Sequence, residues 1–300
     1  MLTYTISDID HCRSAESFLR NLLPGAPSAY LHKLVKSGHL TLNGVTVEPG
    51  TLFRLGDTVT VKESGKTTSF LIAKRPALDI LFEDQWIIVF NKPPGLPMHR
   101  AAEVDERNLV DLGGRLLAER DGFPGKLRPV NRIDRGTSGA VIMAKSPTAA
   151  GMFGRFVKEE GLAKVYLAVA QGRLPKEGVV TQPLEGKEAE TAFRLLFQGD
   201  MRALAAVYPL TGRMHQIRQH FRFAGHSILG DRRYGGSPQP EYEGIFLHSF
   251  RTSLTHPATG ENLTFFAPLP AGFLAQLRNL TGEFFLTLLQ GLSGIPADYP

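Results

Sequence analysis

One carboxylate is set apart by its immediate neighbours. Asp134 lies between Arg132 and Arg135 in the segment PVNRIDRGTSGAVIMAK, residues 129–145. Nearby positive charge lowers the pKa of a carboxyl group and so keeps it ionised. An ionised carboxylate can act as a nucleophile, which makes Asp134 a candidate for chemistry. The alternative is that it holds a turn through Asx or salt-bridge contacts, the commoner role of an aspartate in such a segment.

A second group of polar residues lies in the segment PLTGRMHQIRQHFRFAGHSILGD, residues 209–231. The spacing of its apolar residues predicts a helix over 215–224 with one buried side. Arg218 and Arg222 then share the polar face of this helix. Arg213 lies at its entrance.

Three histidines in this segment raise the question of a metal. His215, His220 and His226 are spaced by five and six residues, so no two imidazoles share a helical face. Cys12 is the only cysteine, which leaves no thiolate cluster and no intrachain disulfide. We therefore expect neither a metal nor a cofactor.

Length and composition indicate a globular protein. The chain has 300 residues, of which 42% are hydrophobic, enough for one large core and a second small domain. No apolar run approaches the roughly 18–20 residues that span a bilayer, and the start of the sequence lacks the features of a signal peptide. We therefore expect a cytoplasmic protein.

The net charge of +5 is unevenly distributed. Residues 1–76 hold nine Lys and Arg against six Asp and Glu, whereas the remaining 224 hold twenty-five against twenty-three. A mild basic excess of this kind suits a polyanionic partner such as nucleic acid, although many basic faces are merely solvated.

The N-terminal 62 residues read as a small unit of two helices and a sheet. Helical spacing covers Arg13 to Leu23 and again Ser28 to Ser37, and Asn43-Gly44 predicts a tight hairpin before a further strand. Lys33 and Lys36 lie opposite the apolar stripe of the second helix. Cations in this position could meet a phosphate backbone, or they could be an ordinary solvated face.

The rest of the chain predicts a larger domain. Residues 63–77 look like a linker, 78–280 an α+β domain with a mainly antiparallel sheet, and 281–300 a tail in which EFFLTLLQGL fits a helix. Strands are expected at 140–145, 164–172 and 191–197. Helices are expected at 108–120, 147–160 and 215–224.

Five segments in order carry a resemblance to a known family. They are ILFEDQWIIVFNKPPGLPMH, VNRIDRGTSGAVIMAKS, KVYLAVAQG, PLTGRMHQIRQHF followed by GHSILGDRRYG, and FLHSFRTSLTHPATG. Together they resemble the pseudouridine synthases of the RluA type, the ribosomal large-subunit family. The segment LHKLVKSGHLTLNG near the N-terminus resembles the alpha-L RNA-binding domain of ribosomal small-subunit protein four.

The resemblance implies a role for each matching position. Asp134 corresponds to the catalytic aspartate that attacks the target uridine, so that the base detaches, rotates and rejoins the ribose through carbon five. Arg213 matches the basic residue that pairs with this aspartate. Tyr166 matches a tyrosine against the uracil, and Leu247 an apolar residue on the pocket floor. Arg132 matches an arginine that fills the base stack after the base has flipped out, a step that costs a few kcal/mol.

One position departs from the family pattern. The family commonly has His-Arg-Leu-Asp where this chain has Asn131-Arg132-Ile133-Asp134. Asparagine still donates and accepts hydrogen bonds, so we expect altered local bonding and an intact mechanism.

The resemblance also implies the partners. We expect a monomeric enzyme that modifies structured RNA, most simply bacterial large-subunit (23S) ribosomal RNA, with transfer RNA as the alternative target. A non-catalytic RNA-binding or ribosome assembly factor of the same fold is a second alternative, although Asp134, Tyr166 and Arg213 are all present. A glycoside hydrolase is disfavoured because only one acid lies in the motif core.

Overall fold

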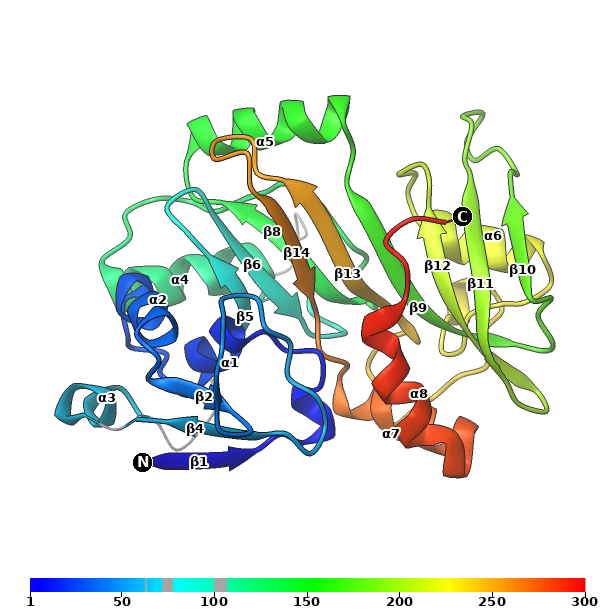
Figure 1. Ribbon diagram of the computed structural model, residues 1–300. Helices are drawn as coiled ribbons and strands as arrows, with labels where there is room; N and C mark the ends of the chain where they lie inside the picture. Colours follow the sequence, from blue (N-terminus) through cyan, green and yellow to red (C-terminus); the bar gives the residue numbers. More distant parts are fainter. Residues whose placement is uncertain (63, 72–77, 100–106, 300) are drawn as a thin grey trace.

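The computed structural model describes residues 1–62, 64–71, 78–99 and 107–299. It contains a small N-terminal sheet with its own helices and a ten-stranded sheet that forms the body of the protein (Figure 1). Apart from one parallel pair, β8 with β13, the paired strands of the large sheet are antiparallel. The α+β class expected from the sequence is therefore confirmed.

The N-terminal unit follows the predicted pattern of elements. Its helices are α1 (Ala15–Leu22) and α2 (Ser28–Lys36), and its strands, in sheet order, are β1 (Leu2–Thr5), β4 (Thr58–Val61), β2 (Leu40–Leu42) and β3 (Val45–Thr46). The turn between β2 and β3 has φ of 51° at Asn43 and 83° at Gly44, the left-handed values that a two-residue hairpin of the primed type needs. A short 3-10 helix, η1 (Asp8–Asp10), precedes α1.

The segment expected to be a linker is partly helical. Helix α3 (Gly65–Phe70) lies within residues 63–77, and the Ser64 hydroxyl caps it by accepting from the Thr67 main-chain N–H. The expected linker therefore includes one short helix. The sequence signal was present, because a serine three residues before a threonine-rich turn is a typical N-cap.

The large sheet has the strand order β10-β11-β12-β9-β13-β8-β6-β5, with β14 paired to β13 and β7 to β8. In chain order its strands are β5 (Asp79–Glu83), β6 (Ile87–Lys92), β7 (Arg128–Pro129), β8 (Ser138–Ala144), β9 (Ala163–Gln171), β10 (Glu177–Val180), β11 (Thr191–Gln198), β12 (Arg202–Pro209), β13 (Leu247–Thr255) and β14 (Asn262–Phe266). The strands expected near 140–145, 164–172 and 191–197 are β8, β9 and β11.

The helices of the body include three that lie close to their predicted positions and one, over 271–281, that was not predicted. They are α4 (Leu109–Asp121), α5 (Pro147–Glu159), α6 (Gln216–Phe223), α7 (Ala271–Thr281) and α8 (Phe285–Gly291), with 3-10 turns η2 (Arg232–Tyr234), η3 (Gly282–Phe284) and η4 (Leu292–Gly294). The tail does pack on the body, because Phe285 and Leu289 are buried against the sheet. No helix in the described ranges is both long and apolar enough to cross a membrane.

The two faces of the sheet are covered by different helices. Side chains alternate along a strand, so Tyr166, Ala168 and Ala170 of β9 point to one core and Val165, Leu167 and Val169 to the other. The first core includes residues of α4 and α6, and the second includes residues of α7 and α8. Tyr166 therefore lies on the face that α6 covers.

The N-terminal unit is attached to the body through α1 and β5. Arg13 Nη1 and Nη2 donate to the two carboxylate oxygens of Asp79 at 2.5 and 2.8 Å, and Arg13 is buried. Burial alone would raise the pKa of Asp79, but the Arg13 charge and hydrogen bonds from Asn91 and Asn21 outweigh it and lower the pKa. The carboxylate is therefore held in its charged form at the contact.

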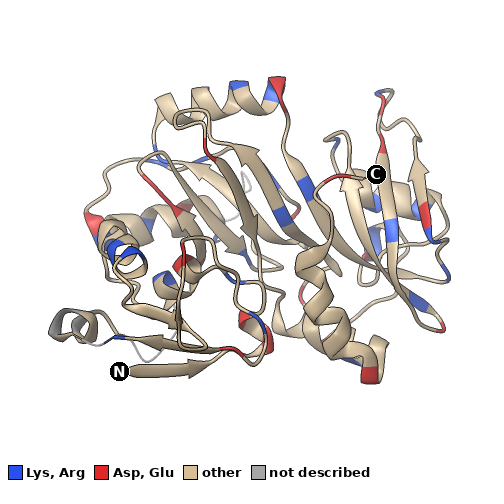
Figure 2. Cartoon of the chain, viewed as in Figure 1, with Lys and Arg blue, Asp and Glu red and all other residues tan. Residues whose placement is uncertain are grey.

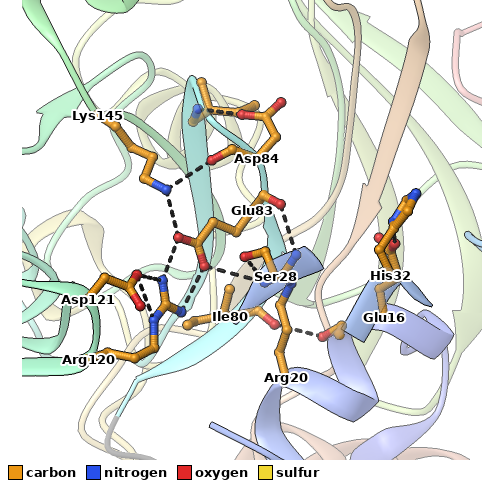
Figure 3. Close-up of polar contacts among 12 residues, drawn as sticks. Glu16, Arg20, Ser28, His32, Ile80, Glu83, Asp84, Arg120, Asp121 and Lys145 are labelled. Carbon is orange, nitrogen blue, oxygen red and sulfur yellow. Dashed lines mark hydrogen bonds and ion pairs between the residues drawn. The ribbon is translucent and has the colours of Figure 1, made fainter. Parts of the chain in front are cut away.

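A second buried acid extends this attachment (Figure 3). Glu83, at the end of β5, accepts from Arg120 of α4 at 2.6 and 2.8 Å and from Lys145 at 2.7 Å. Arg20 of α1 donates to the Glu83 main-chain oxygen at 2.8 Å and approaches its carboxylate at 3.3 Å. One carboxylate thus joins the N-terminal unit, α4 and the end of β8.

Candidate active site

The Asp134 loop is positioned by a close approach of two strands. Asp134 precedes β8, and the Thr137 N–H closes a turn on the Asp134 main-chain oxygen at 3.1 Å. Gly139 has φ of 114°, and a Cβ there would lie 2.3 Å from the Ser249 oxygen of β13. Only glycine permits this approach, which lets β8 pair in parallel with β13 and brings the loop beside Leu247.

The Asp134 carboxylate is held by Arg218 of α6. Arg218 Nη1 donates to Asp134 Oδ2 at 2.8 Å, while Nε and Nη2 donate to both oxygens of Asp231 at 2.6 and 2.8 Å. Burial would lower the pKa of Arg218, but the two carboxylates outweigh this and raise it. Arg218 is therefore a fixed positive charge in direct contact with Asp134.

This pairing corrects the sequence interpretation. The residue expected to pair with Asp134 was Arg213, but Arg213 is exposed and its Nε donates to the Glu188 main-chain oxygen at 2.8 Å. Arg218, expected on a polar face with Arg222, is only 9% exposed. Asp231 accepts hydrogen bonds from Nε and Nη2, and Asp134 accepts one from Nη1. These two carboxylates compensate the guanidinium charge, so Arg218 can be buried.

A cavity of about 390 Å³ opens over Asp134. Its lining includes every site residue expected from the larger domain: Arg132, Asp134, Tyr166, Arg213 and Leu247. Lys33 and Lys36 are not part of it, since both are exposed on α2 in the N-terminal unit. Lys and Arg positions occur in both units, as Figure 2 shows.

Tyr166 supplies an aromatic wall to this cavity. Burial raises the pKa of its phenol to about 12, and the nearby Asp134 charge adds to the effect. The hydroxyl therefore stays protonated at neutral pH. Leu247, 3% exposed, adds an apolar surface. Together they fit a flat, weakly polar group such as a base.

Two residues of the motif before Asp134 take different roles. Asn131 Oδ1 accepts from the Ile142 N–H at 2.7 Å and its Nδ2 donates to the Ala140 oxygen at 3.4 Å, so Asn131 fastens the loop to β8. Arg132 is exposed at the cavity and makes no hydrogen bond or ion pair with the described residues. Its guanidinium is therefore available to a ligand.

Lys92 supports the Asp134 loop but was not among the site residues predicted from the sequence. It is fully buried, and its Nζ donates to the main-chain oxygens of Leu96, Pro93 and Arg135 at 2.8, 3.0 and 3.0 Å. Because Arg135 follows Asp134 directly, the hydrogen bond from Lys92 to the Arg135 main-chain oxygen holds the Asp134 loop in place. The Lys-Pro-Pro-Gly turn was visible in the sequence, but nothing there indicated that the lysine turns inward.

The site thus combines a carboxylate held by an arginine, a protonated phenol and an apolar floor in one cavity. The described part of the chain contains no cluster of three or more His, Cys, Asp or Glu suited to a metal ion. Such a site can offer a carboxylate to an electrophilic carbon while a planar group is held beside it.

Comparisons with known proteins identify the family. Residues 86–223 match the RNA pseudouridylate synthase family. The ribosomal large subunit pseudouridine synthase C of Escherichia coli K12 is 31% identical over 88% of this chain and 92% of its own length. This chain belongs to the RNA pseudouridine synthase family. It is therefore an RNA-modifying isomerase.

Other pseudouridine synthases agree in sequence and in fold. An uncharacterized RNA pseudouridine synthase of Bacillus subtilis is 29% identical over 92% of this chain and 97% of its own length. The structure of human RNA pseudouridylate synthase domain containing 1 superposes with a TM-score of 0.52 at 26% identity, covering 64% of this synthase and 84% of the human chain. Within this family, the cavity over Asp134 is the candidate active site.

Proposed function

We propose that this pseudouridine synthase modifies uridines of large-subunit (23S) ribosomal RNA, with Asp134 as its nucleophile. The observation that supports this is the Asp134 carboxylate, held by Arg218 at the wall of a cavity that also contains Tyr166 and Leu247. The name of the E. coli relative supports the choice of RNA.

The proposed reaction needs no outside reagent. Asp134 attacks the target nucleoside, the bond between N1 and the ribose C1′ breaks, and the uracil rotates within the cavity. When the bond from carbon five to C1′ forms, the bond that Asp134 made to the substrate breaks and the carboxylate is regenerated. The proton on carbon five is then lost, and N1 gains a proton. Reactants and products therefore balance as isomers.

The target uridine must leave its helix to reach Asp134. The carboxylate side chain is only 25% exposed, at the wall of a cavity, where a base stacked in a helix cannot reach it. Arg132, exposed at the same cavity and without a hydrogen-bond or ion-pair partner among the described residues, is suited to fill the gap that the flipped base leaves. The exposed Lys33 and Lys36 of α2 supply a further RNA contact in this proposal.

The test is a map of pseudouridines in ribosomal and transfer RNA from cells with and without the gene. We expect one or more 23S positions to lose the modification and to regain it on complementation with the wild-type gene. Loss confined to transfer RNA would overturn the choice of target and leave the chemistry intact. An unchanged map that is accompanied by a ribosome assembly defect would favour the non-catalytic alternative.

A further inference from the structure

His215 stands directly before α6 in a backbone conformation that side chains rarely adopt. Its φ and ψ are 54° and 23°, in the left-handed region. Histidine, asparagine and aspartate tolerate this region better than most residues, but glycine enters it without cost. The imidazole at this position therefore calls for a reason beyond the turn itself.

The imidazole faces the Asp134 carboxylate. His215 Nε2 lies 3.7 Å from Asp134 Oδ1, and Arg218 donates to the other oxygen, Oδ2. His215 also lines the cavity over Asp134. The two oxygens of the carboxylate thus have two different neighbours, both from the start of α6.

The orientation of the imidazole is set by Tyr234 of η2. His215 Nδ1 lies 3.0 Å from the Tyr234 hydroxyl, and the two rings meet edge to face with centroids 5.7 Å apart. The Arg218 guanidinium lies 4.9 Å from the centre of the same Tyr234 ring. Tyr234 therefore contacts both residues that approach Asp134.

We propose that His215, oriented by Tyr234, is a positioning residue that fixes the Asp134 carboxylate for attack. The inference rests on the family activity and on Asp134 as the nucleophile, but not on which RNA is the target.

The protonation state fits this role. Burial lowers the pKa of His215, the Arg218 and Arg233 charges lower it further, and the Asp134 and Asp231 carboxylates oppose them without reversing the shift. The ring is therefore neutral at pH 7. The proposal has the Tyr234 hydroxyl donate to Nδ1, which leaves the single ring proton on Nε2, directed at Asp134. The other tautomer would turn a lone pair toward the carboxylate.

A neutral neighbour suits a nucleophile better than a second cation. Arg218 already places one positive charge against Asp134 Oδ2. A second full charge on Oδ1 would hold the attacking lone pairs more tightly, whereas an N–H dipole limits rotation of the carboxylate at less cost to its reactivity. At 3.7 Å the contact is longer than a hydrogen bond, as contacts in free enzymes often are, and it can shorten when substrate binds.

The kinetic test separates the imidazole from the turn. His215→Asn keeps a residue that tolerates the left-handed backbone, His215→Ala removes that tolerance as well, and Tyr234→Phe removes only the hydroxyl. The control is His226→Asn, a partly buried histidine bonded to the Gln171 main-chain oxygen outside the cavity. Turnover is measured by tritium release from transcripts of 23S and transfer RNA labelled at carbon five of uridine.

We expect His215→Asn to lower kcat about 10-fold or more with KM within about 2-fold, because geometry and not binding is lost. Tyr234→Phe should lose less, and the double variant should be no worse than His215→Asn, since the tyrosine acts through the histidine. Wild-type kcat in His215→Asn, or fully additive losses in the double variant, would overturn the proposal. A loss in His215→Ala alone would assign the effect to the turn.

A second readout needs no RNA. Side-chain ¹⁵N NMR of the free protein at pH 7.5 should show His215 as the neutral Nε2–H tautomer, with the population disturbed in Tyr234→Phe. The Nδ1–H tautomer in the wild type would contradict the proposal even if turnover changed. If the wild type releases no tritium from either RNA, the proposed target fails, whereas the NMR result still decides on His215.

Discussion

Arg218 and Asp134 form an ion pair of 2.8 Å in which the arginine is shared with a second carboxylate, Asp231. The two contacts of Asp231 occupy one edge of the guanidinium and leave Nη1 turned toward Asp134. The direction of the donor is therefore fixed before substrate arrives. A preorganised charge of this kind costs no reorganisation during the reaction.

Replacing Arg218 by lysine should cost far more activity than the same change at Arg213. A lysine ammonium is a point charge and cannot bind Asp231 and Asp134 with one rigid fork. We expect Arg218→Lys to lower kcat by about 100-fold or more, on the scale of a lost electrostatic group in an active site. Arg213→Lys is the matched control. A similar loss of kcat in both variants would contradict the assignment of the Asp134 pairing to Arg218 alone.

Asp134→Asn should abolish isomerisation and leave the fold and RNA affinity close to wild type. The amide keeps the shape of the side chain but is no longer a nucleophile. Tritium release measures the reaction, and filter binding to a 23S transcript measures affinity. The rate of tritium release by Tyr166→Phe should lie between those of the wild type and Asp134→Asn, because the ring is kept and the hydroxyl is lost. Turnover at the wild-type rate by Asp134→Asn would rule out Asp134 as the nucleophile.

The limits of sequence reasoning are clearest in α6. The apolar spacing predicted this helix to within two residues, because a buried stripe is a local pattern. The same pattern assigned Arg218 to the polar face, whereas its burial depends on Asp134, 84 residues away, and on Asp231 beyond the helix. Asp134, Tyr166 and Leu247 were found through ordered motifs, and the cavity brings them together. Lys92 was missed because its partners are main-chain oxygens, which no sequence pattern displays.

Lys92→Met should destabilise the protein and lower its activity. The change leaves the main-chain oxygens of Leu96, Pro93 and Arg135 without their donor, so we expect a loss of about 2–3 kcal/mol in the free energy of unfolding. Urea unfolding followed by circular dichroism measures it. Lys158→Met, on the exposed side of α5, is the control and should change little.

The pH dependence of this effect has a definite sign. Burial lowers the pKa of Lys92 from 10.5 to about 7 in the folded protein. Between these values the unfolded chain binds the proton and the folded chain does not, so the unfolding free energy of the wild type rises with pH relative to Lys92→Met. A difference between the two proteins that stays constant from pH 7 to 9 would contradict the shift.

Asp79→Asn should loosen the N-terminal unit from the body. The buried Arg13 then keeps its charge but loses its bidentate partner, and we expect a loss of about 2 kcal/mol in stability. Asp8→Asn is the matched control, since its partner Arg278 is 56% exposed, and it should cost less than about 1 kcal/mol. Hydrogen exchange in α1 and urea unfolding measure the two variants.

Acid should have the same effect as Asp79→Asn. The pKa values of Asp79 and Glu83 are lowered in the folded protein, because the Arg13, Arg120 and Lys145 cations outweigh the effect of burial. Their contribution to stability is therefore complete above about pH 4.5 and is lost as the pH falls through the lowered values. Protection factors in α1, corrected for the intrinsic exchange rate at each pH, that do not fall as the pH is lowered from 7 to 2 would show that these acids do not hold the interface.

The last prediction separates RNA affinity from chemistry. Lys33 and Lys36 lie one turn apart on the exposed face of α2, far along the chain from the cavity residues. If each meets a phosphate, each adds roughly 0.7–0.9 to the slope of log affinity against log salt, through counterion release. The Lys33→Ala, Lys36→Ala double variant should therefore bind a 23S transcript more weakly at moderate salt, with a shallower slope. Its turnover at saturating RNA should hardly change, because Asp134, Arg218 and Tyr166 are untouched.

A charge-matched control makes the result specific to α2. Arg54→Ala with Lys62→Ala removes two exposed cations of the same unit from other elements. If the slope of log affinity against log salt falls by the same amount in both double variants, the contact is general attraction between a basic unit and a polyanion. If the α2 variant binds as tightly as the wild type at every salt concentration, α2 does not contact RNA. If it instead loses turnover on saturating RNA, the N-terminal unit takes part in forming the active site, and the attachment through Arg13 and Asp79 is the contact to test next.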